Sequence, residues 1–166
     1  MRTARLELRP LSATAASALL HDRQAAIDVI GARLPSDWPQ GDLLGILPMQ
    51  AAAAQDAERL GVWLMIERDT NTVVGDVGFL GPPDDGLLEI GFSVIPDCRR
   101  RGYATEAARA MVAWALREPG VRGVVARCDA DNEASIGVIQ RVGFVRTDEV
   151  DGQIQWVSAG ATEAPS

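Results

Sequence analysis

The sequence has few of the residues that build metal sites, disulfide frameworks or membrane spans. It contains one histidine and two cysteines, Cys98 and Cys128, among 166 residues. The cysteines have neither metal-ligand spacing nor a paired framework, which is typical of reduced thiols in a cytoplasmic protein. No apolar run approaches the roughly 20 residues of a membrane-spanning helix, and the N-terminus has no apolar signal core. We therefore expect a cytoplasmic location, no membrane partner and no bound metal.

A surplus of basic residues is also lacking. Lys and Arg number 16 against 23 Asp and Glu, which leaves a net charge of −7. A nucleic-acid binder usually shows a basic face to phosphates, so no nucleic-acid partner is expected, whereas a cationic amine is compatible with this balance. The length suits one domain with a sizeable core. We predict a single domain over residues 1–157 and a small, polar, disordered tail over 158–166.

Local patterns in the first part of the chain predict one strand and two helical regions. Residues 5–11 alternate apolar and polar side chains and form the expected first strand. A helix is predicted over 12–30, with a break near Asp22. The stretch 34–48 is rich in proline and glycine and is predicted to be a loop with apolar content. Residues 49–60 return to a helical pattern.

The rest of the chain alternates strands and helices. Strands are predicted over 62–68, 73–80, 87–95, 123–128, 144–148 and 153–157, and helices over 102–118 and 133–141. The order β-α-α-β-β-β-α-β-α-β-β gives an α/β (α+β) class, with a mixed central sheet of about seven strands and about four helices. The strands on either side of the 102–118 helix must run parallel through a right-handed crossover.

The junction that enters this crossover helix has the chemistry of a pyrophosphate site. It reads R-R-R-G-Y-A over 99–104. The free N–H groups at a helix start and the helix dipole favour an anion there, and Gly102 and Ala104 let phosphate oxygens approach closely. The alternative is an ordinary helix start with a solvated basic run. The two common nucleotide-binding glycine patterns are absent.

This segment and two others resemble the GNAT superfamily of N-acetyltransferases. R-R-R-G-Y-A fits the R/Q-x-x-G-x-G/A pattern that binds the pyrophosphate of acetyl-CoA in that superfamily. The stretch D-A-D-N-E-A-S-I-G-V-I-Q-R-V-G-F over 129–144 is similar to the N-x-x-S…G-F segment of its ribosomal-protein N-terminal acetyltransferase branch. The opening over 3–10 is similar too. The resemblance is strongest over 87–144 and implies a GNAT fold.

The resemblance also implies which residues hold acetyl-CoA. The main chain of Phe92, Ser93 and Val94 would pair with the pantetheine arm as an added strand. The pyrophosphate would bind at Arg99, Arg100, Arg101, Gly102, Tyr103, Ala104 and Thr105. Asn132 and Ser135 would lie near the pantetheine and the thioester, although Asn132 is also suited to cap a short helix and Ser135 to lie on its surface.

This sequence departs from the family pattern at one catalytic position. Many GNAT enzymes place a tyrosine four residues before the glycine of the G-F pair to protonate the leaving thiolate, and Ile139 stands there. The N-x-x-S branch generally lacks this tyrosine. The thiolate would then be protonated by Ser135, by a water, or by nothing.

Glu89 is the carboxylate predicted to act as the base and to contact the acceptor amine. Strand alternation places Glu89, Gly91 and Ser93 on one face beside the cofactor strand. A glutamate in a largely apolar strand is unusual, although a solvated edge carboxylate or a structural ion pair would also account for it. Carboxylates near other strand ends are weaker candidates: Asp129, Glu149 and Asp151.

The resulting prediction is transfer of acetyl from acetyl-CoA to a primary amine. The first choice of acceptor is a protein or peptide N-terminus, and the alternatives are a small-molecule amine such as an antibiotic or polyamine, or a non-catalytic acyl-CoA-binding sensor. Trp38 is a candidate to line the acceptor pocket, because an aromatic residue in a Pro/Gly-rich loop often does so. Homodimers are common in the superfamily, so a homodimer is also allowed.

Overall fold

The computed structural model describes residues 1–158 of the chain. Of the predicted disordered tail, Ser158 is the last residue of a strand and is buried, whereas residues 159–166 lie outside the described part. Within 1–158, no helix is long and apolar enough to cross a membrane.

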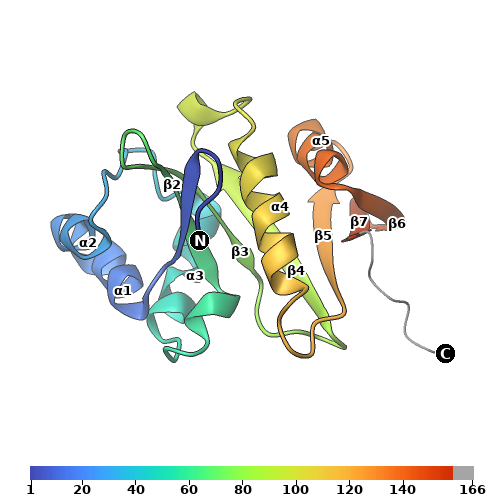
Figure 1. Cartoon of the computed structure of the whole chain (residues 1–166), viewed down its shortest axis with the longest axis horizontal. Coiled ribbons are helices and arrows are strands. Elements are labelled where there is room, and N and C mark those ends of the chain that lie inside the picture. The colour runs from blue at the N-terminus through green and yellow to red at the C-terminus, as the bar shows by residue number, and fades with distance from the viewer. Residues whose placement is uncertain (159–166) are drawn as a thin grey trace.

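A seven-stranded mixed sheet forms the centre of the molecule (Figure 1). Its spatial order is β1-β2-β3-β4-β5-β7-β6. The strands are β1 (Leu6–Pro10), β2 (Val62–Glu67), β3 (Thr72–Phe79), β4 (Leu87–Val94), β5 (Gly123–Asp129), β6 (Phe144–Val150) and β7 (Gln153–Ser158). Among these seven strands of the described chain, only β4 and β5 pair in parallel, and the helix between them is α4 (Tyr103–Ala115). The predicted class, strand number and crossover are confirmed.

Within residues 1–158, five α-helices surround this sheet, one more than the sequence suggested. They are α1 (Ala13–His21), α2 (Arg23–Ile30), α3 (Gly41–Ala51), α4 and α5 (Glu133–Val142), with short 3₁₀ turns η1 (Glu58–Leu60) and η2 (Pro96–Cys98). The predicted break at Asp22 is present, because its carboxylate accepts hydrogen bonds from the amides of Gln24 and Ala25 and caps α2.

The prediction for residues 34–60 was wrong in two places. Helix α3 begins inside the predicted loop and contains Pro48, and the predicted helix over 49–60 reduces to the end of α3 and the single turn η1. Leu43 and Leu47 are buried on the inner side of α3. Their packing outweighs the local signals of glycine and proline, because tertiary contacts routinely override propensity.

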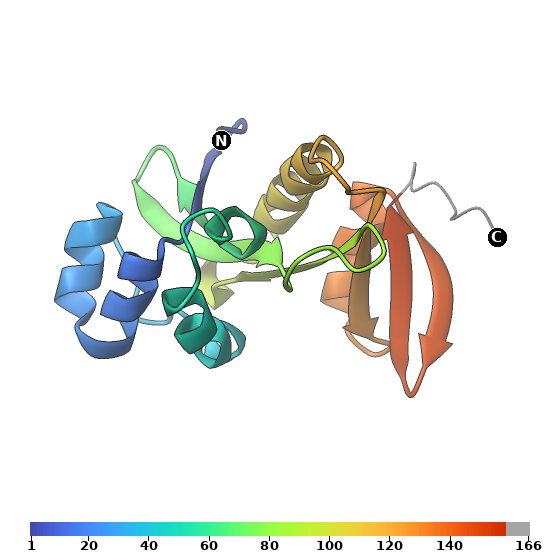
Figure 2. The same cartoon turned by 90° about the horizontal axis from the view of Figure 1, so that it is seen from below.

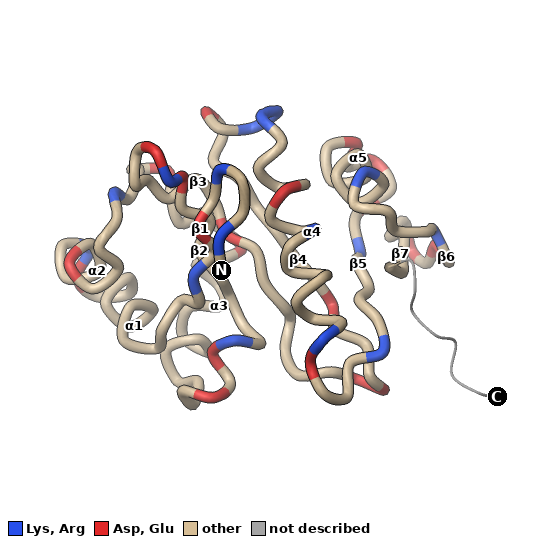
Figure 3. Tube along the Cα trace, in the orientation of Figure 1, with Lys and Arg blue, Asp and Glu red and all other residues tan. Residues whose placement is uncertain are grey.

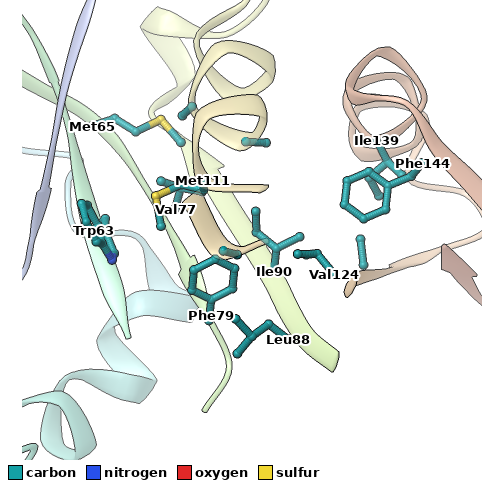
Figure 4. Packing of buried hydrophobic residues seen from close by; sticks show 14 of the residues in the cluster. Trp63, Met65, Val77, Phe79, Leu88, Ile90, Met111, Val124, Ile139 and Phe144 are labelled. Atoms are coloured by element: carbon teal, nitrogen blue, oxygen red, sulfur yellow. The ribbon is translucent and has the colours of Figure 1, made fainter. Parts of the chain in front are cut away.

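The two faces of the sheet carry separate cores. Trp63 and Met65 of β2 point to the face covered by α4, where they pack in one cluster with Met111 (Figure 4). Leu64 and Ile66 point the other way, into a cluster with residues of α1, α2 and α3. Figure 2 shows these three helices on the side of the sheet away from α4. This alternation is the period-two pattern of a strand buried on both faces. The face beneath α3 bears directly on the candidate site.

Candidate active site

Strands β4 and β5 pair over only half of their length and then diverge. Their parallel pairing runs from Leu87 with Gly123 to Ile90 with Ala126 and stops there. Beyond that point residues 91–94 pair with β3 and residues 127–129 pair with β7. Two strand edges therefore face each other without pairing, at the carboxyl ends where a parallel crossover commonly places its ligand.

The unpaired edge of β4 is suited to receive an extended chain. Leu80 N donates to Glu89 O, and Ile95 N donates to Val74 O, at 2.9 Å each. By strand alternation, the main-chain groups of Phe92 and Val94 point toward the gap, while those of Ser93 point to β3. The carbonyl of Val94 also accepts a hydrogen bond from Arg99 Nε at 3.0 Å. An arm that carries amide groups could add to this edge as peptides add to sheet edges.

The start of α4 stands above this gap with free amides and positive charge. The first helical hydrogen bond runs from Glu106 N to Gly102 O at 3.0 Å. The amides of Tyr103, Ala104 and Thr105 are thus left without an acceptor inside the helix. Gly102 has a left-handed backbone with φ of 81°, and the preceding arginines, blue before α4 in Figure 3, are exposed. Such a junction favours a diphosphate.

Side chains distant in sequence hold this junction in place. Arg5 Nη1 donates to Arg101 O at 2.7 Å, and Arg5 Nε pairs with Glu106 at 2.8 Å. The Arg5 guanidinium also lies 4.5 Å from the centre of the Tyr103 ring. The Tyr103 hydroxyl donates to Glu67, and this bond raises the pKa of the buried tyrosine. Tyr103, the only tyrosine in the sequence, is thus part of the core on the α4 side of the sheet. Sequence reasoning missed Arg5, Glu67 and Glu106.

A cavity of about 470 Å³ connects the gap to the space beneath α3. It brings together four residues of the predicted site, namely Phe92, Ser93, Asn132 and Ser135. Asn132 Oδ1 accepts a hydrogen bond from Ser135 N at 3.1 Å and caps α5. Asn132 is therefore a helix cap that also lines the cavity, while its contact with pantetheine stays a prediction.

Glu89 occupies the predicted strand face but is engaged in an ion pair. Its Oε2 atom lies 2.5 Å from Arg127 Nη1, and the side chain is 25% exposed. Of this pair, Arg127 is the member that lines the cavity. The ion pair matches one of the alternatives that the sequence left open for Glu89.

Trp38 does not line the cavity, which corrects the expectation from its Pro/Gly-rich loop. The side chain is completely buried in the α1–α3 core beside Leu43 and Leu47. Its ring is large enough to fill the space under the helices, and its indole N–H requires a partner there. That partner is Asp76 of β3, whose Oδ2 atom accepts from Trp38 Nε1 at 2.9 Å.

Asp76 is a cavity residue that sequence reasoning also missed. It is half-buried, lines the cavity and pairs in register with Ser93 of β4, whose hydroxyl donates to Oδ2 at 3.3 Å. Burial raises its pKa to about 6, although the hydrogen bonds from Trp38 and Ser93 act in the opposite direction and Asp42 adds a further rise. An acid within the apolar run V-V-G-D-V-G-F was the available signal.

Comparison with known proteins identifies the family. Residues 5–145 match the model of the acetyltransferase (GNAT) domain. The chain belongs to the GNAT acetyltransferase family. A GNAT relative of Bacillus subtilis, the uncharacterized N-acetyltransferase YjdG, is 30% identical over 161 residues, which cover 95% of this chain and 96% of the relative.

Solved structures of acetyltransferases share the fold at low sequence identity. The ribosomal α-N-protein acetyltransferase RimL in complex with coenzyme A has a TM-score of 0.62 and 19% identity, with 93% of this chain and 94% of that chain covered. A chimera of the spermidine N-acetyltransferase SpeG from Vibrio cholerae and hSSAT has a TM-score of 0.63 and 13% identity, with 93% and 95% covered. Within residues 1–158, no group of three or more His, Cys, Asp or Glu is placed to hold a metal ion.

Proposed function

We propose that this GNAT acetyltransferase moves an acetyl group from acetyl-CoA to the α-amino group of a peptide or protein. The observation that carries the proposal is the gap between β4 and β5. The start of α4, with its free amides, adjoins one end of the gap, and a cavity lined by Asp76 adjoins the other. The free amides suit the diphosphate of the coenzyme, and a cavity lined by carboxylates suits an ammonium.

The donor would be held mainly by main chain. The pantetheine arm would add to β4 at Phe92 and Val94, and the pyrophosphate would lie against the amides of Tyr103, Ala104 and Thr105. The three preceding arginines, Arg99 to Arg101, are exposed and would supply positive charge to the pyrophosphate.

The transfer requires a neutral amine, a polarised carbonyl and a thiolate leaving group. The amine nitrogen attacks the thioester carbon directly, so no acyl-enzyme forms. A free thiol has a pKa near 8.5, so the leaving thiolate needs little help. Ser135, which lines the cavity, or a water would supply the proton, because Ile139 replaces the tyrosine of many GNAT enzymes.

The role of Glu89 as the base stays a prediction. Its position on the strand face with Ser93 supports that role, whereas its ion pair with Arg127 opposes it, because one carboxylate oxygen is already engaged by a guanidinium. Asp76, the register partner of Ser93, is a competing carboxylate on the same face of the sheet.

The peptide acceptor rests on the likeness to RimL and on the N-x-x-S segment. A polyamine is a second candidate, favoured by the cavity itself, since Asp42, Asp76 and Asp129 all line it and several carboxylates suit a polycation. The cytoplasmic location and the homodimer stay predictions as well.

We expect release of coenzyme A and acetylation of an unblocked peptide, with no turnover of the same peptide carrying an N-acetyl group. Mass spectrometry of the product is the appropriate measurement, because it detects the acetylated amine directly and does not depend on a thiol-reactive dye, which the free cysteines Cys98 and Cys128 could complicate. Turnover of spermidine without turnover of any peptide would support the second candidate. If acetyl-CoA raised the melting temperature but no amine were acetylated, the chain would be a sensor.

A further inference from the structure

The two oxygens of Asp76 have different surroundings. Trp38 Nε1 and Ser93 Oγ both donate to Oδ2, at 2.9 and 3.3 Å. Oδ1 accepts no hydrogen bond from any residue within 1–158. It is also not fully enclosed, because the one enclosed side-chain polar atom without a partner in that range is Trp156 Nε1. Since Asp76 lines the cavity, Oδ1 is the atom that a ligand there can reach.

No cation within the described residues neutralises this carboxylate. The charged group that acts on Asp76 is another acid, Asp42 of α3, which lies exposed at the same cavity. On the neighbouring strands, the residues paired in register with Asp76 are Ser93 of β4 and Leu64 of β2, and neither is charged. Arg127 also lines the cavity but pairs with Glu89. A half-buried carboxylate without a cationic partner is costly, and an ammonium ligand would relieve that cost.

We propose that Asp76 Oδ1 binds the acceptor as an ammonium ion and takes up its proton before acetyl transfer. This inference rests on the proposed function and specifies its substrate class, an amine that enters in its charged form beneath α3. Trp38 and Ser93 are positioning residues, because their hydrogen bonds to Oδ2 fix the orientation of the carboxylate. Oδ1 is left available to the ligand.

The proton balance of this step is complete. The ammonium gives one proton to Asp76, and the neutral nitrogen then forms a bond to the thioester carbon. The carbon–sulfur bond breaks, and the second nitrogen proton passes to the sulfur through Ser135 or water. The products are the amide, the free thiol and a protonated Asp76, which returns its proton to solvent. Because its pKa is about 6, Asp76 is ionised at neutral pH. The same pKa is near enough to neutral pH for the carboxylate to take up and release a proton readily.

Asp76→Asn tests this role while keeping an oxygen that can accept from Trp38. We expect kcat to fall by on the order of 10²–10⁴, with acetyl-CoA affinity and melting temperature maintained. Asp28→Asn, at an exposed acid of α2, is the matched control and should have wild-type turnover. In Glu89→Gln, which removes the competing carboxylate, the loss should be smaller than in Asp76→Asn; the reverse order would overturn the proposal.

The pH profile separates a proton acceptor from a merely structural acid. An α-amine with a pKa of about 7.7–8.0 stays protonated in the acid range, so wild-type kcat/KM should level off above pH about 6, where Asp76 is ionised. In Asp76→Asn, kcat/KM should keep rising with pH above about 6, because only the neutral fraction of the amine reacts and that fraction grows with pH. Trp38→Phe should move the wild-type midpoint to higher pH, because the N–H that stabilises the charged form is lost. A midpoint unchanged in both variants would refute the role.

Binding without turnover distinguishes this proposal from the proposed function. With coenzyme A present, an unblocked peptide that the wild type acetylates should bind Asp76→Asn at least about tenfold more weakly, which equals 1.4 kcal/mol. The N-acetyl peptide, which lacks the ammonium, should bind both proteins equally. Equal loss for both peptides would reject Asp76 as the ammonium site, whereas a wild type that acetylates no amine would reject the proposed function instead.

Discussion

Replacement of Gly102 by valine is expected to lower the affinity for acetyl-CoA by about 10- to 100-fold, or roughly 1.4–2.8 kcal/mol. The backbone at Gly102 has φ of 81°, in the left-handed region, where a β-branched residue is strained by about 1–3 kcal/mol. A Cβ atom there would also lie 3.3 Å from Nη2 of Arg5, the residue whose Nη1 atom holds the loop by donating to the Arg101 carbonyl. Both effects displace the amides that would bind the pyrophosphate. Isothermal calorimetry measures the loss.

Gly31→Val provides a matched control for this experiment. Gly31 also has a left-handed backbone, with φ of 67°, and a Cβ would meet no atom within 4 Å. It ends α2, which lies on the opposite side of the sheet from α4. The control should therefore lose a similar amount of stability but bind acetyl-CoA like the wild type. Unchanged affinity in a folded Gly102→Val protein would show that the pyrophosphate binds elsewhere.

Truncation of Trp38 to alanine is expected to reduce the free energy of unfolding by about 3–5 kcal/mol, the usual cost of removing a large buried aromatic side chain. The ring has no exposed surface, so its loss leaves a cavity between the sheet and α3. The variant also deprives Asp76 of its indole donor. Urea unfolding at neutral pH measures the change.

Trp38→Phe separates the packing of the ring from its hydrogen bond. It keeps most of the buried aromatic surface and removes only the N–H, so its loss of stability should be clearly smaller than that of Trp38→Ala. A pocket-lining tryptophan would behave differently: its truncation would weaken acceptor binding and leave unfolding almost unchanged. Such a result would contradict the buried position of Trp38.

Local patterns in the sequence are enough to predict the sheet, the crossover helix and the junction that enters it. Strand alternation, the helical stripe of α4 and the glycine at the start of that helix each operate within a few residues. The R-R-R-G-Y-A and N-x-x-S segments are equally local. The sequence alone therefore identifies Gly102, Asn132 and Ser135 as candidate site residues and carries the resemblance to the family.

Which carboxylate presents an unpaired oxygen to the cavity depends on the tertiary structure. Glu89 and Asp76 are both acids in apolar strands, and no local pattern separates them. Their partners, Arg127 and Trp38, each lie 38 residues away in sequence, and the Arg5–Glu106 contact spans 101 residues. Such pairs depend on strand register and on helix packing over the sheet, which no short window of sequence contains. The same packing turned the Pro/Gly-rich stretch into α3, buried Trp38 beneath it and left one oxygen of Asp76 without a partner.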